Sequence, residues 1–147
     1  MTVATAEPYV LFELAGTAYA VPSAAVQRME MVEQVTPVPN APAFVDGVVF
    51  SRGQVVPAMS LRGRFGFPRR GYDAATRLIV VAHGARTVGL IVDSAREFVT
   101  IPADAVHPPP EGMAGTSGKY LGGVATVGGR VVLILNVAEV LGHTNAH

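Results

Sequence analysis

The stretch FVDGVVFSRGQVVPAM, residues 44–59, has the pattern of a β-hairpin. Short valine-rich runs lie on both sides of Arg52-Gly53, and glycine readily adopts the positive φ of a tight turn. We therefore predict strands over residues 47–50 and 54–59, joined at Arg52-Gly53.

The same pattern returns 76 residues later as YLGGVATVGGRVVLIL, residues 120–135, with its turn at Gly128-Gly129. The alignment of the two stretches continues without a gap and ends by matching Gly66 with Gly142. A hairpin pattern over residues 9–21 is echoed over residues 78–92, with a small insertion. The chain is thus an internal repeat, in which each half holds a hairpin, a single strand and a second hairpin.

This repeat predicts an all-β fold. The single strands are expected over residues 29–35 and 97–101, because valine-rich runs bounded by proline and glycine are typical of strands. Short helical turns are expected over residues 23–28, with Ser23 as a cap, and over residues 137–141.

The two halves also predict boundaries within a single domain, residues 1–147. Closing a short sheet into a barrel protects its edges, so we expect two pseudo-symmetric five-stranded barrels. The first is expected over residues 9–70, the second over residues 76–142, and a tail over residues 143–147. Half of 147 residues makes a small core, so the barrels are expected to share an apolar interface.

Composition argues against several classes of protein. The 11 basic and 11 acidic residues cancel, which disfavours binding to nucleic acid or to anionic lipid. Aliphatic runs such as residues 131–135 are far shorter than the roughly 20 residues of a spanning helix, so no membrane insertion is predicted. The chain has no cysteine and begins without the pattern of a secretory signal, so a cytoplasmic location is expected.

No pattern for catalysis, a cofactor or a metal survives inspection. Residues 112–119 superficially resemble a phosphate-binding loop, but Met113 replaces a required glycine and Tyr120 replaces the Ser/Thr that would reach Mg²⁺. Ser117 lacks the glycine that a nucleophile elbow requires two residues later. Zinc normally takes three or four ligands, and the histidines are too scattered to supply them: His83, His107, His143 and His147.

Two charged features remain. Asp93 ends an apolar run, where we expect it to cap a turn or to pair with an arginine. Several arginines in residues 62–70 stand beside Phe65 and Phe67, and a solvated loop is the first expectation for this segment. A partner site is the alternative, because arginine and aromatic residues are enriched at protein interfaces.

Several stretches resemble the CheW-like chemotaxis coupling proteins. GVVFSRGQVVP, residues 47–57, is similar to the signature hairpin of the family, and PNAPAFV, residues 39–45, precedes it as in the family. The resemblance covers residues 9–142 in the family's order and spacing. It also includes VGLIVD at residues 88–93, YLGGV at residues 120–124 and VLILN at residues 132–136.

The resemblance implies two intertwined SH3-like five-stranded barrels. It also implies a non-enzymatic adaptor, without cofactors, that joins a CheA-type histidine kinase to the cytoplasmic tip of a chemoreceptor. One barrel end would dock on the homologous domain of the kinase. A groove between the barrels would accept the helical hairpin of the receptor, through spaced apolar anchors.

The resemblance further implies five residues for contact with these partners. Val26 and Arg28 match the segment that faces the receptor in the family, and Arg52 matches the arginine of the signature hairpin. Val88 and Leu90 match strand positions near the groove. The alternative reading places Val26, Val88 and Leu90 in the core and gives Arg52 only the support of its turn.

The chain departs from the family pattern at several positions. Phe50-Ser51 stands where Asn-Leu is common, and Ser60 and Asn136 stand where aspartates are common. Such changes fit a divergent receptor or a non-flagellar chemosensory system, such as one that controls pili.

Arg28 occupies a position that is often acidic, which affects the expected pairing of Arg52. Glu30 would lie on the same face of an extended strand as Arg28 and is the expected substitute partner for Arg52. Two other functions stay open: a small-ligand sensor whose groove binds an apolar molecule, and a general protein-interaction module. An enzyme that uses Asp93 or His83 is disfavoured, because no paired acid–base group accompanies either residue.

Overall fold

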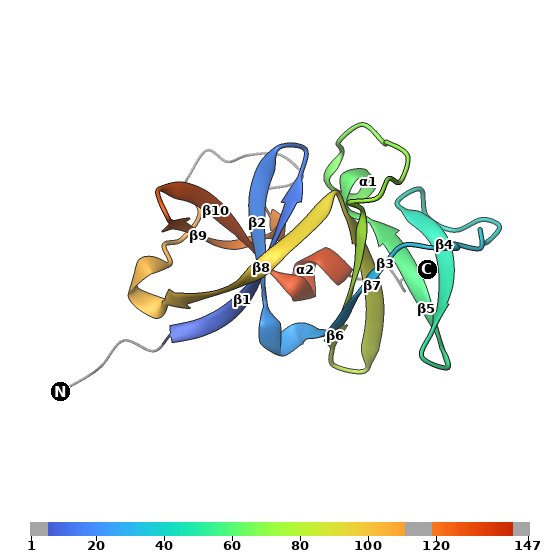
Figure 1. Ribbon diagram of the computed structural model, residues 1–147, viewed down its shortest axis with the longest axis horizontal. Coiled ribbons are helices and arrows are strands. Elements are labelled where there is room, and N and C mark those ends of the chain that lie inside the picture. Colours follow the sequence, from blue (N-terminus) through green and yellow to red (C-terminus); the bar gives the residue numbers. More distant parts are fainter. Residues whose placement is uncertain (1–5, 111–118, 143–147) are drawn as a thin grey trace.

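The computed structural model describes residues 6–110 and 119–142, which form ten β-strands and four short helices (Figure 1). The predicted tail, residues 143–147, and most of the rejected phosphate loop lie outside the described residues. In chain order the elements are β1 (Ala6–Leu14), β2 (Thr17–Pro22), η1 (Ser23–Ala25), β3 (Val26–Met31), β4 (Val45–Ser51), β5 (Gln54–Ser60), α1 (Leu61–Phe65), β6 (Arg77–His83), β7 (Arg86–Val92), β8 (Ser94–Pro102), η2 (Ala103–Ala105), β9 (Leu121–Val127), β10 (Arg130–Leu135) and α2 (Val137–Leu141).

The strands form two five-stranded sheets, which confirms the all-β prediction. One sheet has the order β8-β1-β2-β10-β9 and is called barrel A; the other has the order β3-β6-β7-β5-β4 and is called barrel B. The two SH3-like barrels lie side by side, with α2 between them (Figure 1).

The barrels are not the contiguous halves, residues 9–70 and 76–142, that the repeat predicted. Hairpin β1–β2 joins strands of the second half in barrel A, and hairpin β6–β7 joins strands of the first half in barrel B. Parallel pairings of β2 with β10 and of β5 with β7 make these connections. The prediction was wrong because a repeat indicates which strands form hairpins, whereas either combination of hairpins satisfies the same local pattern. The intertwining implied by the family resemblance is the observed arrangement.

The pseudo-symmetry extends to individual hydrogen bonds. In barrel B, Thr36 and Val48 exchange backbone hydrogen bonds of 2.9 Å in both directions. In barrel A, His107 and Val124 exchange equivalent bonds of 2.9 and 2.8 Å. Since Val48 and Val124 are related by the 76-residue repeat, the structure confirms the symmetry that the sequence predicts.

Apolar side chains fill one cluster inside each barrel and a larger cluster between the barrels. In β1, Leu11 faces the interior of barrel A, whereas Phe12 packs in the shared cluster. In β6, Leu78 faces the interior of barrel B and Ile79 packs in the shared cluster. Successive side chains of a strand point to opposite faces, so these strands are buried on both sides. The predicted apolar interface between the barrels is confirmed.

A short helix follows the last strand of each half. Helix α2 agrees with its predicted bounds, but α1 replaces the solvated loop expected from residue 62. Leu61 and Phe65 of α1 are buried in the shared cluster, and Gly66 ends the helix with a left-handed φ of 85°. These apolar positions, four residues apart, were the signal for a helix that the sequence analysis missed.

Two other boundaries differ from the prediction. The first helical turn covers only Ser23–Ala25, and its N-cap is Pro22 with no side-chain cap, so Ser23 does not have the predicted role. Strand β3 begins earlier than predicted, at Val26, because the residues after η1 pair at once with β6. The single strand predicted over residues 97–101 lies within β8.

The helix caps explain two departures from the family pattern. Ser60 Oγ accepts a hydrogen bond of 3.1 Å from the Gly63 amide, and Asn136 Oδ1 accepts one of 3.2 Å from the Glu139 amide. Serine, asparagine and aspartate are all effective N-caps. Each substitution therefore retains the function that an aspartate would have at these helix starts.

We expect Asn136→Ala to lower the free energy of unfolding by about 1 kcal/mol, because the cap to the Glu139 amide is lost. Asn136→Asp retains the acceptor and is expected to leave stability within about 0.5 kcal/mol of the wild type. Urea denaturation followed by circular dichroism measures both. An equal loss in the two variants would exclude capping as the role of Asn136.

Candidate partner interface

Val26 and Arg28 lie on β3, an edge strand of barrel B. Val26 pairs with Val81 and Arg28 with Val80, with an irregularity in register between the two pairs. The Val26 side chain is half-buried and packs against the shared core. Val26 thus contributes to the core and also borders the surface, and its contact with a partner stays a prediction.

Arg28 forms a polar network with Glu30 and Ser51. Its Nε donates to Glu30 Oε2 and to Ser51 Oγ, both at 3.0 Å, and the Ser51 hydroxyl donates to Glu30 Oε2 at 2.6 Å. The Arg28 and Glu30 side chains are 16% and 26% exposed, so the pair is partly shielded from water. Glu30 shares a face with Arg28 as predicted, but it binds Arg28 and Ser51 and does not substitute as the partner of Arg52.

Arg52 lies at the tip of hairpin β4–β5. Its φ is 53° and that of Gly53 is 77°, so both central residues of the turn are left-handed, as a type I′ hairpin requires. The side chains beside it are exposed apolar groups: Phe50 is 75% and Val55 63% exposed. An arginine flanked by exposed apolar side chains has the composition of a protein interface.

The hairpin tip borders an open hollow of about 400 Å³ on barrel B. Exposed Met31 and Phe50 contribute apolar surface to its lining, while Glu30, Glu33 and Arg52 contribute charge. We call Met31, Phe50, Arg52 and Val55 the barrel-end patch. Sequence analysis noted Phe50 only as a departure from the family pattern and did not single out Met31 or Val55, because alternation along a strand does not tell which face is covered.

Val88 and Leu90 lie in the interior of the protein. They are 3% and 0% exposed and belong to the shared core cluster. Both side chains pack in this cluster between the barrels, so neither faces a partner at the surface. The structure therefore supports the core reading of these two residues.

An open groove of about 580 Å³ runs between the barrels. Among the described residues, its lining contains no Asp, Glu, Lys or Arg and consists largely of small and apolar side chains, with His83 at the β6–β7 turn. Val26 follows directly after one of the lining residues. The groove is lined by Tyr9, Pro22, Ala24, Ala25, Ala82, His83, Gly84, Val106, Gly122, Ile134, Leu135, Asn136, Val137 and Ala138.

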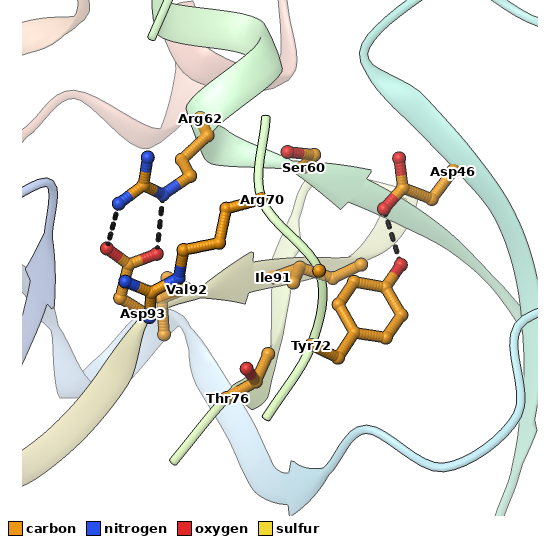
Figure 2. A pocket seen from close by; sticks show the side chains of 10 residues that line it. Asp46, Ser60, Arg62, Arg70, Tyr72, Thr76, Ile91, Val92 and Asp93 are labelled. Carbon is orange, nitrogen blue, oxygen red and sulfur yellow. Dashed lines mark hydrogen bonds and ion pairs between the residues drawn. The ribbon is translucent and has the colours of Figure 1, made fainter. Parts of the chain in front are cut away.

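A second, much smaller pocket lies between α1, β7 and the segment after α1 (Figure 2). It has a volume of only about 20 Å³, and charged side chains surround it. Arg62 and Asp93 face each other on one side, and Tyr72 meets Asp46 on the other (Figure 2).

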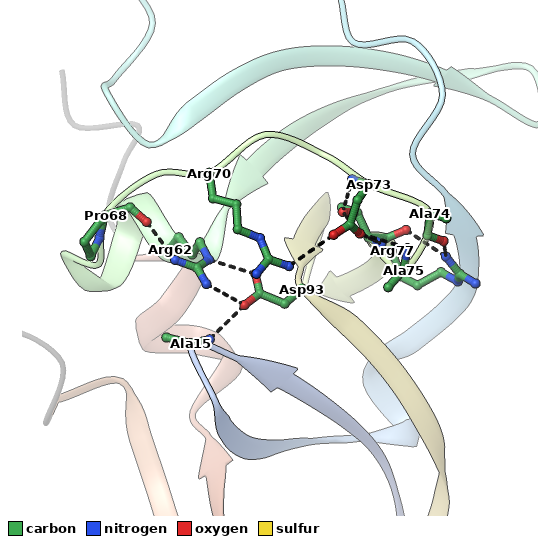
Figure 3. A network of polar contacts seen from close by, with 10 residues as sticks. Ala15, Arg62, Pro68, Arg70, Asp73, Ala74, Ala75, Arg77 and Asp93 are labelled. Carbon is green, nitrogen blue, oxygen red and sulfur yellow. Dashed lines mark hydrogen bonds and ion pairs between the residues drawn. The ribbon is translucent and has the colours of Figure 1, made fainter.

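Asp93 connects the two barrels through a polar clamp (Figure 3). Its two carboxylate oxygens accept hydrogen bonds of 2.8 Å from Nε and Nη2 of Arg62, and Oδ2 also accepts one of 2.8 Å from the Ala15 amide. Arg62 belongs to barrel B through α1, whereas Ala15 is in the β1–β2 turn of barrel A. The sequence prediction that Asp93 meets an arginine or a turn is confirmed, since it meets both.

The clamp shifts the acidity of Asp93. Burial alone raises the pKa of this carboxyl, but hydrogen bonds from Arg62 and from the Ala15 amide favour its charged form, and the result is a pKa below its ordinary value. The hydrogen bond to Asp93 in turn raises the pKa of the Arg62 guanidinium. The pair is thus ionised at neutral pH.

The described residues contain no helix long and apolar enough to cross a bilayer. Within the same residues, no three His, Cys, Asp or Glu side chains are grouped as metal ligands would be. The surfaces that the fold builds are an open groove and an apolar barrel end, which suit the binding of other proteins.

Comparison with known proteins shows the family of this chain. The model of the CheW-like domain family matches residues 8–145. The chain therefore belongs to the CheW-like family, the chemotaxis coupling adaptors that its motifs resemble.

Individual relatives match along most of the chain. It is 30% identical to the chemotaxis protein CheW of Klebsiella aerogenes over 92% of this chain and 81% of that protein. Identity to the chemotaxis protein CheW of Bacillus subtilis is 32%, over 74% of this chain and 70% of that protein. The crystal structure of the scaffolding protein TtCheW from Thermoanaerobacter tengcongensis superposes with a TM-score of 0.86 at 26% identity and covers 92% of both chains.

Proposed function

We propose that this protein is a non-enzymatic, cytoplasmic adaptor that couples the cytoplasmic tip of a chemoreceptor to a CheA-type histidine kinase. The inter-barrel groove would bind the helical receptor tip, and the barrel-end patch would bind the regulatory domain of the kinase. The observation that carries the proposal is the open groove between the barrels, whose lining, within the described part of the chain, holds no Asp, Glu, Lys or Arg.

The shape and lining of the groove favour a helix over a small molecule. Ala24, Ala25, Ala82, Gly122 and Ala138 contribute small side chains, which allow the backbone of a helix to approach closely. Pockets for small ligands enclose most of the ligand surface, whereas this groove is open. Helix-in-groove recognition instead uses apolar anchors spaced along one helix face.

The barrel-end patch supports a second contact. Arg52 retains a left-handed backbone, which costs a non-glycine residue about 1–2 kcal/mol. Its neighbours Phe50 and Val55 remain exposed to water. A strained arginine between exposed apolar side chains supports a role in binding.

Groove binding is tested by substitution in α2, where Ala138 lines the groove and Glu139 is exposed outside the groove lining. Ala138→Arg places a charge in the apolar contact and is expected to raise the Kd for a receptor cytoplasmic fragment at least tenfold, about 1.4 kcal/mol. Glu139→Arg, the matched control, is expected to change the Kd less than twofold. Titration calorimetry with each purified variant measures both values.

Coupling is tested by co-sedimentation with the kinase and receptor fragments, scoring both ternary assembly and kinase activity. Assembly should require the adaptor and weaken in Arg28→Ala and Arg52→Ala variants that keep the wild-type circular dichroism spectrum. Equal affinities of the two α2 variants would overturn the groove assignment. If neither partner binds and a small apolar metabolite raises the Tm, the proposal of an adaptor is wrong and a ligand sensor is the better function.

A further inference from the structure

The pseudo-symmetry relates the open groove, which is lined in part by the second half of the chain, to an equivalent position in the first half. The 76-residue repeat matches Gly122, Asn136 and Ala138 of the open groove with Asp46, Ser60 and Arg62. These three equivalents all line the small pocket of Figure 2. The two sites are thus the same place in the two halves, with volumes of about 580 and 20 Å³.

The second site is small because the chain itself covers it. The segment of residues 67–73, here called the strap, crosses the site after α1, and Arg70 and Tyr72 line what remains of it. The remaining volume holds about one water molecule. The strap is therefore in the position where the open groove offers space for a helix.

The strap is tied down at both ends. At its start, the Phe67 amide donates to Arg62 O at 2.8 Å and Arg62 Nη1 donates to Pro68 O at 2.9 Å. Further along, Arg69 and Tyr72 both bind the carboxylate of Asp46. Asp46 is only 12% exposed beneath them.

The groups that hold the strap are confined to this side of the molecule. The positions related to Asp46 and Arg62 by the repeat are Gly122 and Ala138, which carry no polar side chain. A segment lying over the open groove would find neither the carboxylate nor the guanidinium. The difference between the covered site and the open groove therefore comes from the residues that line them.

We infer that the strap is an intramolecular occupant that masks a second helix-binding groove and leaves the protein with one groove for its partner. Asp46 is the residue that holds the strap closed. The masking stands on the contacts of this chain alone, whereas the consequence for partner number rests on the proposed function.

Thiol labelling tests the masking without any partner, because the chain has no cysteine of its own. Ser60→Cys and Asn136→Cys form a matched pair: both residues cap a helix, and they line the masked and the open site. We expect Ser60→Cys to react with a thiol reagent at least tenfold more slowly than Asn136→Cys. Adding Asp46→Ala should raise the rate for Ser60→Cys at least tenfold and leave that for Asn136→Cys unchanged.

Asp104→Ala is the control for the loss of one carboxylate, because Asp104 is exposed in η2 and distant in sequence from the strap. It should alter neither labelling rate. Equal rates for the two cysteine variants, or no effect of Asp46→Ala, would overturn the masking.

Calorimetry with a receptor cytoplasmic fragment tests the consequence. Wild type should bind one equivalent and Asp46→Ala two. If labelling reports an opened site while the stoichiometry stays at one, the inference that the strap limits partner number is wrong. If the wild type binds no fragment while labelling reports release by Asp46→Ala, the proposed function fails and the masking stands.

Discussion

Gly47→Ala is expected to lower the free energy of unfolding by about 3–5 kcal/mol, combining backbone strain with overpacking. Gly47 has a φ of 151°, a region that residues with a side chain rarely adopt. A Cβ at this position would lie 2.1 Å from the carbonyl oxygen of Thr36. That oxygen accepts the 2.9 Å hydrogen bond from the Val48 amide, so the backbone cannot move away without breaking the bridge to β4.

Gly53→Ala separates the two causes of this loss. Gly53 also has a positive φ, of 77°, but a Cβ there would meet no atom of the described residues within 4 Å. Its substitution is expected to lower the free energy of unfolding by only about 1 kcal/mol. Guanidinium denaturation measures the free energy of unfolding of both variants. An equal loss in the two would show that the contact with Thr36 contributes nothing to the effect of Gly47→Ala.

Asp93→Ala is expected to lower the free energy of unfolding by about 3 kcal/mol, because Arg62 and the Ala15 amide lose a partly buried partner. The Arg62 and Asp93 side chains are 16% and 15% exposed, which limits solvent screening of the pair. The clamp also joins the barrels, so its loss acts on the whole fold. Thermal and urea denaturation of the purified variant measure the change.

A double-mutant cycle with Arg62→Ala isolates the Asp93–Arg62 contact, for which a coupling energy of about 2 kcal/mol is expected. Asp104 serves as the control, because it is exposed in η2 and outside the clamp. Asp104→Ala should therefore show no coupling to Arg62→Ala. Strictly additive losses for Asp93→Ala and Arg62→Ala would contradict the clamp.

The clamp also predicts a pH dependence. The pKa of Asp93 is lowered in the folded state, so the folded protein keeps this carboxylate charged at pH values where the unfolded chain takes up a proton. Its contribution to stability is complete above the ordinary carboxyl pKa of 3.8 and falls away as the pH drops through the lower folded value. The difference in stability between wild type and Asp93→Ala should therefore narrow below about pH 4. A constant difference down to about pH 2 would show that folding does not lower the pKa of Asp93.

The hairpins were predictable from sequence because the residues that form each turn and its two strands are adjacent in the chain. Arg52-Gly53 and Gly128-Gly129 have the positive φ values that their turns require, and the alternation beside them places the strands. The exchange of hairpins was not predictable from the repeat, because pairing between distant strands leaves no local mark. Helix α1 was missed because five residues contain barely one turn of helical periodicity.

In the candidate site too, local features were predictable from sequence and contacts between distant strands were not. Arg52 could be placed at its turn from sequence, whereas Arg28, expected in a helical turn, lies on β3. The contact of Glu30 with Ser51 could not be predicted, because Ser51 approaches from another strand. Val88 and Leu90 were offered both as groove residues and as core residues, since a strand buried on both faces shows no alternation. The sheet order makes β7 a central strand, and packing between the two barrels places both residues in the interior.

The exchange of hairpins has a consequence for how the chain folds as it is synthesised. Hairpin β1–β2 emerges first, yet its neighbours in the sheet, β8 and β10, begin at Ser94 and Arg130. Neither barrel is complete until most of the chain is available, so an N-terminal fragment ending after α1 has no full sheet. Contacts between strands so distant in sequence slow folding. Until β8 and β10 are available, the apolar faces of hairpin β1–β2 are exposed and can associate with other chains.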